Sequence, residues 1–210
     1  MYENSVSNLI KKEIMQNAMS GEKYITESTL CVRTGISRTK LRETLKTLDS
    51  HGMIERKQKC GVALCSYSRE ELKELYELRI LLESRGVNKT VKNASEQDLF
   101  ELQQISNEIE LAVKMNNRIE SAIKDSLFHR KLVQISGGKT TLRIVDSLRL
   151  IENTMDIAIG RDISPDPYTH VDMIEAIRNK DVKTYKKLLV NHIKWIAREM
   201  LKYRDNSKRV

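Results

Sequence analysis

The sequence contains no apolar run that approaches the roughly 20 residues needed to cross a membrane as a helix. Its first residues, MYENSVSNLIKKEI, carry acidic side chains and lack the apolar core of a signal peptide. Only three cysteines occur, and their odd number and spacing do not match a metal site, although Cys60 and Cys65 allow the hypothesis of a thiol switch. We therefore expect a protein of the reducing cytoplasm without a membrane partner.

The sequence signatures of several enzyme classes are also absent. The chain has no Gly-rich phosphate loop, no nucleophile elbow around a serine and no H-E-x-x-H helix. It has no internal repeat or low-complexity tract, and its two prolines, Pro165 and Pro167, fall in one turn. The chain therefore lacks the common sequence signatures of enzymes that hydrolyse nucleotides, transfer acyl groups or cleave proteins with zinc.

Positive charge, by contrast, is plentiful. The formal net charge is +8 and the isoelectric point is about 9.3, values that suit a polyanionic partner without naming one. Residues 1–66 contain 11 Lys and Arg against 7 Asp and Glu, and the remaining residues contain 26 against 22. The net charge is +4 in each part, so the net positive charge per residue is higher in the shorter N-terminal part.

The first 66 residues show the element order of a winged helix. Helical periodicity covers residues 5–18, a second short helix follows the N-cap residue Thr26, and a third runs from Ser37 to Gly52. The following segment, MIERKQKCGVALC, predicts two short strands around a basic, glycine-containing turn. The second and third helices then form a helix-turn-helix, a motif whose third helix enters the major groove of DNA.

The third helix carries two separate stripes of side chains. Leucines line the face that is expected to pack on the domain, while Arg and Lys recur every four residues on a displaced face. The apolar stripe consists of Leu41, Leu45 and Leu48, and the cationic stripe consists of Arg38, Arg42 and Lys46. A cationic stripe is either an ordinary solvated face or a DNA-reading surface, and the winged-helix order favours DNA reading, with Arg38 and Arg42 on base edges. The predicted DNA-contacting residues are Ser37, Arg38, Thr39, Lys40, Arg42, Lys46, Arg56, Lys57, Lys59 and Gly61.

From Ser68 onward the pattern is helical throughout. Apolar residues recur at helical spacing, no strand alternation is visible, and short turns separate the segments. The predicted helical segments are 68–92, 95–117, 119–136, 139–160, 167–180 and 182–204. The sequence therefore predicts an all-helical antiparallel bundle for the second domain.

Three of the four histidines and one aspartate lie in this helical region at a spacing that favours a shared site. Asp125 and His129 are four residues apart and share one helix face, while His170 and His192 stand at similar heights on two helices joined by a short turn. Three imidazoles and a carboxylate suit a first-row divalent ion, zinc first and nickel or manganese next, with coordination positions left open. The alternative is three unrelated polar histidines on a bundle. The fourth, His51, ends the third helix, and we assign it a structural role.

The motifs resemble a known family over nearly the whole chain. GISRTKLRETLKTLDSHGMIERKQKCGVAL resembles the winged helix of the GntR family of bacterial transcription regulators, and the helical segments resemble the FCD ligand-binding domain of its FadR subgroup. The FCD resemblance is carried by ELYELRILLE, DSLFHRKLVQISGG and HVDMIEAIRNKD. It implies that the aspartate and three histidines above follow the D-x-x-x-H…H…H pattern of metal-binding FCD domains, and that Arg79 grips an effector carboxylate. The alternative for Arg79 is a surface salt bridge with Glu83, four residues further on.

Together these features predict a mainly α protein with a winged helix-turn-helix in residues 1–66 and an FCD-type effector-binding and dimerisation domain in residues 67–210. We expect a homodimeric DNA-binding regulator, in the first place a repressor, that binds an inverted-repeat operator and responds to a small organic acid. Two alternatives stay open: a metal-dependent hydrolase that uses the Asp/His site, and a DNA-binding dimer without an effector. The sequence shows no general base beside the histidines, which argues against the hydrolase, and we predict that the protein is not an enzyme.

Overall fold

The computed structural model covers residues 1–210 and describes the fold of all of them except 1, 51, 66, 159–168 and 208–210; the side chains of 2–5, 149–158 and 203–207 are not described either. His51 and the turn with both prolines therefore lie outside the described residues. The chain divides into two compact units at the junction of Tyr67 and Ser68, and the last part of α8 is grouped with the first unit.

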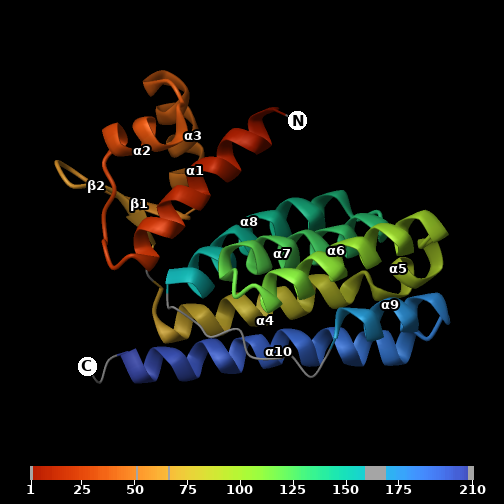
Figure 1. Cartoon of the computed structure of the whole chain (residues 1–210). Coiled ribbons are helices and arrows are strands. Elements are labelled where there is room, and N and C mark those ends of the chain that lie inside the picture. The colour runs from red at the N-terminus through yellow and green to blue at the C-terminus, as the bar shows by residue number, and fades with distance from the viewer. Residues whose placement is uncertain (1, 51, 66, 159–168, 208–210) are drawn as a thin grey trace. The chain divides into compact units, whose positions relative to one another are not determined.

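The N-terminal unit consists of α1 (Tyr2–Met19), α2 (Glu27–Thr34), α3 (Arg38–Ser50), β1 (Ile54–Lys57) and β2 (Gly61–Leu64), as Figure 1 shows. The Thr26 side chain caps α2 by accepting a hydrogen bond from the Thr29 amide, and Gly35 ends that helix in the left-handed conformation. Ser37, directly before α3, caps that helix, since its Oγ accepts a hydrogen bond from the Lys40 amide. The predicted order of three helices and a hairpin is confirmed.

The wing is an antiparallel pair of strands in which Ile54 pairs with Leu64 and Lys57 pairs with Gly61. A further antiparallel bridge joins Ile25, just before α2, to Val62. Gly61 has a φ of 113°, and a Cβ atom there would lie 2.2 Å from the Ile25 carbonyl oxygen. Only glycine fits this close approach, so packing within the domain explains Gly61 without any contact to DNA.

The core of the N-terminal unit forms beneath α3. Leu41 and Leu45 are fully buried and Leu48 nearly so, together with Ile10 and Leu30 from the two preceding helices. Burying this leucine stripe leaves the opposite side of α3 facing solvent. The cationic stripe predicted on that side is exposed along its whole length.

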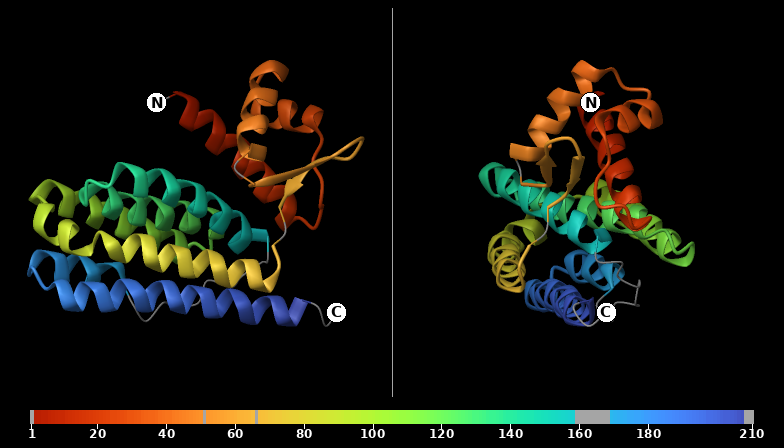
Figure 2. Two further views of the ribbon diagram at one scale, coloured as in Figure 1. Left: turned by 180° about the vertical axis from the view of Figure 1, so that it is seen from behind. Right: turned by 90° about the vertical axis from the view of Figure 1, so that its left-hand side faces the viewer.

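The C-terminal unit is entirely helical in its described residues, as expected. Figure 2 shows its long helices packed side by side, with α10 running along α4 and next to α9, and with α6 against α7. The helices are α4 (Arg69–Arg85), α5 (Val87–Asn93), α6 (Glu96–Lys114), α7 (Arg118–Ile135), α8 (Lys139–Ala158), α9 (His170–Arg178) and α10 (Val182–Ser207). Among the described residues, no helix combines the length and apolar character needed to span a membrane.

The prediction of one continuous helix over residues 68–92 is wrong, because the chain breaks it at Gly86 into α4 and α5. A Cβ atom at Gly86 would lie 2.9 Å from the Ser136 Cβ at the end of α7. The glycine thus lets the end of α7 approach the junction closely. The helical periodicity of the sequence continues through this point and did not reveal the break.

All three cysteines are free thiols and are partly buried. Burial raises the pKa of the Cys65 thiol, and the nearby carboxylates of Glu55 and Asp49 raise it further. A raised pKa lowers the fraction of reactive thiolate at neutral pH. This environment does not favour the thiol-switch hypothesis.

Helices α6 and α7 are joined by an ion-pair cluster on their shared face. Lys131 Nζ lies 2.8 Å from Asp98 Oδ1 and 2.6 Å from Glu101 Oε2. Asp98 also belongs to the capping box of α6, in which the Ser95 side chain accepts from its amide. The hydrogen bond with Lys131 and those with Ser95 outweigh burial and lower the pKa of Asp98 from 3.8 to about 2.

We expect Asp98→Asn to lower the free energy of unfolding by about 1–2 kcal/mol at pH 7, after allowance for solvent screening. Because the pKa of Asp98 is lower in the folded state, its stabilising effect should be complete above about pH 4 and vanish as the pH falls through about 2. Urea denaturation of both proteins across this range measures the difference. Glu96→Gln is the control, since Glu96 lies in the same helical turn and is 85% exposed. A pH-independent difference would contradict the prediction.

Candidate metal centre and nucleic-acid interface

Four side chains from three helices of the C-terminal unit converge on one point. Asp125 and His129 come from successive turns of α7, His170 is the first residue of α9, and His192 lies within α10. A three-residue turn joins α9 to α10, and this connection brings the last two histidines to the same level. One ligand atom from each of the four lies within 4.8 Å of all the others.

The contacts within this cluster are short. His129 Nε2 and His192 Nε2 are 2.9 Å apart, and His170 Nε2 lies 3.0 Å from Asp125 Oδ1. The same Asp125 oxygen lies 3.6 Å from His129 Nε2 and 3.4 Å from His192 Nε2. All three imidazoles therefore present Nε2 to one carboxylate oxygen.

These separations fit a shared metal ion. Two atoms that are each about 2.0–2.1 Å from one ion lie about 2.9 Å apart at a right angle and about 3.4 Å apart at a tetrahedral angle. Two Nε2 atoms at 2.9 Å need a shared proton or a shared cation between them. His129 and His192 are almost completely buried, whereas the side chains of His170 and Asp125 are 12% and 20% exposed. The cluster is thus a buried Asp/His site that could hold a metal ion.

A second carboxylate, that of Glu83 on α4, fixes the orientation of His129. Glu83 Oε2 lies 2.8 Å from His129 Nδ1, and because a carboxylate can only accept, Nδ1 carries the proton. The Nε2 lone pair of a neutral His129 then points into the cluster, as metal coordination requires. Arg79 donates from Nε to Glu83 Oε1 at 2.7 Å and places Nη2 3.8 Å from Asp125 Oδ2.

The electrostatics of the cluster favour an ionised aspartate. Burial by itself favours the neutral carboxyl, but the positive charge of a protonated His129 and hydrogen bonds from His170 and His192 outweigh it and hold the pKa of Asp125 well below its usual range. A cation bound at Nε2 of a neutral His129 would supply that positive charge in place of the proton. The Phe128 ring, which is fully buried, packs edge-on against His170 with 4.4 Å between ring centroids. An ionised carboxylate beside an apolar wall is a suitable ligand for a cation.

The sequence prediction placed the four members of this cluster correctly in one region but missed the role of Glu83. The alternative of a surface salt bridge between Arg79 and Glu83 is wrong, since each side chain is only 1% exposed. The Glu83 carboxylate, which the sequence analysis did not place beside the histidines, contacts His129. The i, i+4 spacing of Arg79 and Glu83 was the available signal, but spacing alone does not distinguish a buried pair from an exposed one.

A cavity of about 290 Å³ is lined by Glu83 and by other residues of α4, α5, α7, the start of α8 and α10. Its lining includes the hydroxyl residues Thr90 and Tyr185 and the cationic residues Arg85 and Lys89. None of the four clustered residues lines it. Glu83 both lines the cavity and contacts His129 of the cluster.

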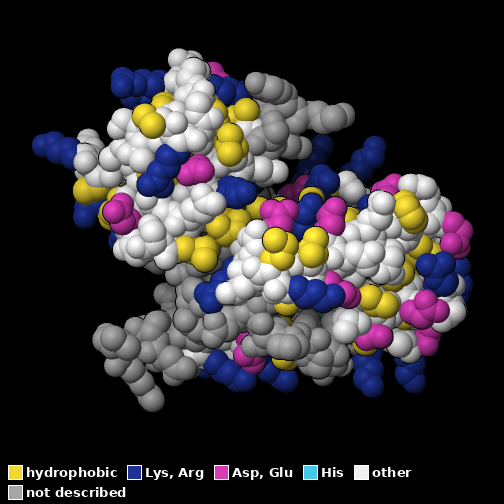
Figure 3. Space-filling model, in the orientation of Figure 1, with side chains coloured by type: hydrophobic (Ala, Val, Ile, Leu, Met, Phe, Trp, Pro, Cys, Tyr) yellow, Lys and Arg dark blue, Asp and Glu magenta, His cyan; other side chains and the backbone are white. Residues whose placement is uncertain are grey.

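In the N-terminal unit, the predicted DNA-contacting residues occupy α3, its N-cap and the wing. Ser37, Arg38, Thr39 and Lys46 belong to the exposed side of α3 or its N-cap. Lys and Arg side chains project from the surface of this unit, with acidic side chains among them, in Figure 3. The structure thus gathers these residues on two neighbouring elements.

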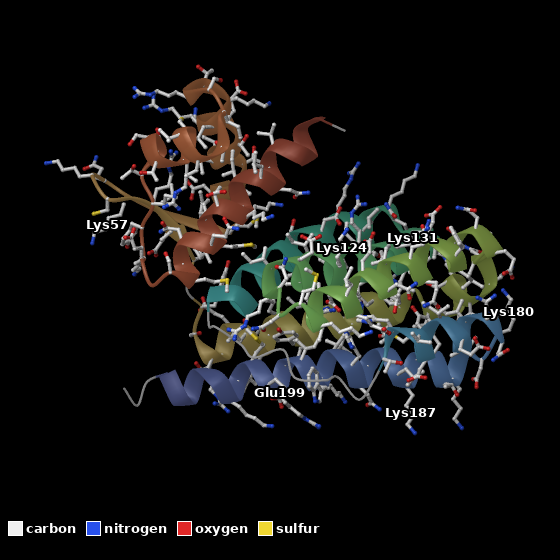
Figure 4. All side chains as sticks on the ribbon, viewed as in Figure 1. Lys57, Lys124, Lys131, Lys180, Lys187 and Glu199 are labelled. Carbon is white, nitrogen blue, oxygen red and sulfur yellow. The ribbon has the colours of Figure 1, made fainter. Side chains whose placement is uncertain are left out.

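Several of these cations have protein partners. Lys40 lies 3.6 Å from Glu43, and both Arg42 and Arg56 bind Glu27. The wing residue Lys57, labelled in Figure 4, lies over the Tyr24 ring at 5.5 Å from its centroid. Lys59 lies in the hairpin turn, where its φ is 65°.

Comparison with known proteins identifies the family to which this chain belongs. Residues 3–64 match bacterial regulatory proteins of the gntR family, and residues 74–194, more than half of the chain, match the FCD domain. The chain belongs to the GntR family and carries the FCD domain. The GntR proteins are DNA-binding transcription regulators, not enzymes, so the hydrolase alternative is wrong. In addition, Glu83 binds Arg79 and the Nδ1 atom of His129. It is therefore not placed to act as a base at the cluster, which lies on the Nε2 side of the His129 ring.

Individual relatives agree with this GntR assignment. The HTH-type transcriptional regulator YdhC of Bacillus subtilis is 28% identical over 130 residues, which cover 61% of this chain and 58% of that protein. The gluconate operon transcriptional repressor of the same organism is 23% identical over 180 residues, or 82% of this chain and 74% of that protein. A solved GntR transcriptional regulator from Rhodococcus sp. RHA1 has a TM-score of 0.77 at 15% identity, over 96% of this chain and 98% of that one, and shares the fold.

We expect Arg79→Met to lower the free energy of unfolding by about 3–5 kcal/mol, because it leaves the buried carboxylate of Glu83 without its cation. Arg130→Met is the matched control. The Arg130–Asp146 pair is 39% and 36% exposed, and its loss should cost less than about 1 kcal/mol. Chemical denaturation of the two variants beside wild type provides the measurement, and similar losses in both would contradict a special role for burial.

Proposed function

We propose that this GntR-family protein is a transcription repressor whose residues 1–66 bind operator DNA and whose residues 67–210 bind a small carboxylate effector near a divalent metal ion. One observation carries the proposal: an Asp/His cluster with metal-ligand spacing lies in the FCD bundle of a chain that also holds a winged helix. The proposal includes a cytoplasmic location, because a repressor of this kind has to reach its operator DNA.

The proposed ligands of the ion are Asp125, His129, His170 and His192. Neutral imidazoles and a carboxylate favour zinc first, with nickel or manganese as the next candidates. A bound divalent ion with open positions supplies a net positive centre that attracts a carboxylate. Arg79, buried beside Asp125 and Glu83, is the proposed cation for the effector's acidic group.

The repressor role is supported by relatives rather than by geometry. The gluconate operon transcriptional repressor and the repressor RspR of Escherichia coli both match most of this chain. We therefore propose that this protein also represses transcription and that its effector is a small organic acid.

A homodimer on an inverted-repeat operator completes the proposal. One winged helix buries too little surface for tight specific binding, so two reading heads related by two-fold symmetry are needed. The effector would act by favouring one arrangement of the FCD helices, and thereby one spacing of the heads, over another. Differential binding to the two arrangements is the only source of such a shift.

The metal ligands can be tested by zinc titration and elemental analysis. We expect wild type to bind one zinc per chain and His129→Ala and His192→Ala to lose it, since each removes a buried ligand. Zinc at 100 times its dissociation constant should also raise the free energy of unfolding of wild type by about 2.7 kcal/mol, and should not do so in the two variants. His51→Ala changes the one histidine outside the cluster and should behave as wild type. Equal zinc content in all four proteins would reject the site.

The DNA-reading helix can be tested on an operator selected from random-sequence DNA. Arg38→Ala should weaken specific binding by about 1–3 kcal/mol and relax the base preference, because a bidentate contact to a base edge is lost. Lys59→Ala should instead weaken binding to all sequences and reduce the salt slope by about one, as expected for a phosphate contact. Electrophoretic shift assays at several salt concentrations separate the two effects. Wild-type affinity and base preference in Arg38→Ala would contradict the assignment.

A further inference from the structure

One carboxylate in the winged-helix unit binds two of the arginines predicted to contact DNA. Glu27 Oε2 accepts a hydrogen bond from Arg42 Nε at 2.8 Å, and Glu27 Oε1 accepts one from Arg56 Nη2 at 2.6 Å. The three residues belong to α2, α3 and β1. A single side chain thus links both helices of the helix-turn-helix to the wing.

Its own helix holds Glu27 in this position. It is the first residue of α2, directly after the N-cap Thr26, where the positive end of the helix dipole favours a carboxylate. The hydrogen bond from Arg42, together with the charges of Arg42 and Arg56, holds the pKa of Glu27 below its usual range. Glu27 is therefore ionised at neutral pH and can bind both cations.

The contact leaves the outer edge of Arg42 accessible. Its Nε engages Glu27, while the side chain as a whole remains 64% exposed. The two terminal nitrogens at the far edge can donate side by side to O6 and N7 of a guanine. A carboxylate bound at Nε fixes the plane of the guanidinium, so less rotamer freedom is lost when the base is bound.

Arg56 is in a different situation. Its side chain is 34% exposed, about half as much as that of Arg42, and one of its terminal nitrogens is bound to Glu27. An arginine used in this way is less available for a phosphate. The geometry therefore separates the two arginines, one presented outward and the other holding the carboxylate from the wing side.

We propose that Glu27 is a positioning residue for sequence readout. It orients the guanidinium of Arg42 toward a guanine, while Arg56, on the wing, binds the other oxygen of the Glu27 carboxylate. This role rests on the proposed DNA-binding function and specifies which side chain reads a base. The carboxylate also places a negative charge near the DNA phosphates, which weakens binding to every sequence. Glu27 thus lowers non-specific affinity while it raises discrimination between bases.

The experiment starts from the full-length wild-type protein and a duplex selected from random-sequence DNA. Fluorescence anisotropy at two salt concentrations then gives the affinity for that duplex, for single-base replacements of it and for a scrambled duplex of equal length. The variants are Glu27→Gln, Glu27→Asp and Arg42→Ala, with Glu43→Gln as the matched control. Glu43 lies beside Arg42 on α3, is 63% exposed and pairs with Lys40, so the control removes the same charge elsewhere on the surface.

We expect Glu27→Gln to bind the scrambled duplex at least as tightly as wild type and to lose roughly tenfold or more of its preference for the selected one. The loss should fall on the guanine whose replacement no longer matters in Arg42→Ala. Glu27→Asp keeps the charge but reaches less far, so its affinity for the scrambled duplex should stay at the wild-type value while the guanine preference falls. Glu43→Gln should retain the wild-type preference.

An unchanged guanine preference in both Glu27 variants would overturn the role of Glu27 and leave DNA binding intact. An equal loss of preference in Glu43→Gln would reduce the effect to net charge and would overturn it too. Failure of the wild-type protein to select any sequence would overturn the proposed function, and this inference with it.

Discussion

Compensation of buried charge is the constraint on which the helical bundle depends. Arg79 and Glu83 are each 1% exposed, and ionised groups so far from water are tolerated only when charged or hydrogen-bonded partners surround them. Glu83 binds both Arg79 and His129, and the imidazoles in turn surround Asp125. Each group therefore fixes the next, and the cluster inherits a defined geometry from a carboxylate that is not one of its four members.

The winged-helix unit uses the same arrangement at its surface. There Glu27 binds two arginines from different elements, with solvent screening and partial exposure in place of burial. In both units a carboxylate that was not among the predicted site residues orients the side chains of residues that were. The physical reason is common to both, because long cationic and imidazole side chains have many rotamers and a charged partner selects one.

The position of the cluster suits a regulatory domain. Its members and Glu83 come from four helices, α4, α7, α9 and α10, so an ion held by the cluster would be bound by residues of three helices and linked through Glu83 to the fourth. Packed helices adopt discrete arrangements rather than deforming continuously, and a ligand that binds one arrangement better shifts the population toward it. Glu83, which contacts His129 of the cluster, also lines the cavity.

Local patterns in the sequence determined much of this protein: the caps at Thr26 and Ser37, the buried leucines of α3, the order of helices and wing, and the i, i+4 pair of Asp125 and His129. These features need only near neighbours, so propensity and periodicity reveal them. The tertiary structure alone decided which faces are buried against what. It buried Arg79 with Glu83, turned Glu83 toward His129, and brought Glu27 to two distant arginines. Each of these depends on a partner beyond its own helix, and periodicity carries no information about which partner a face will meet.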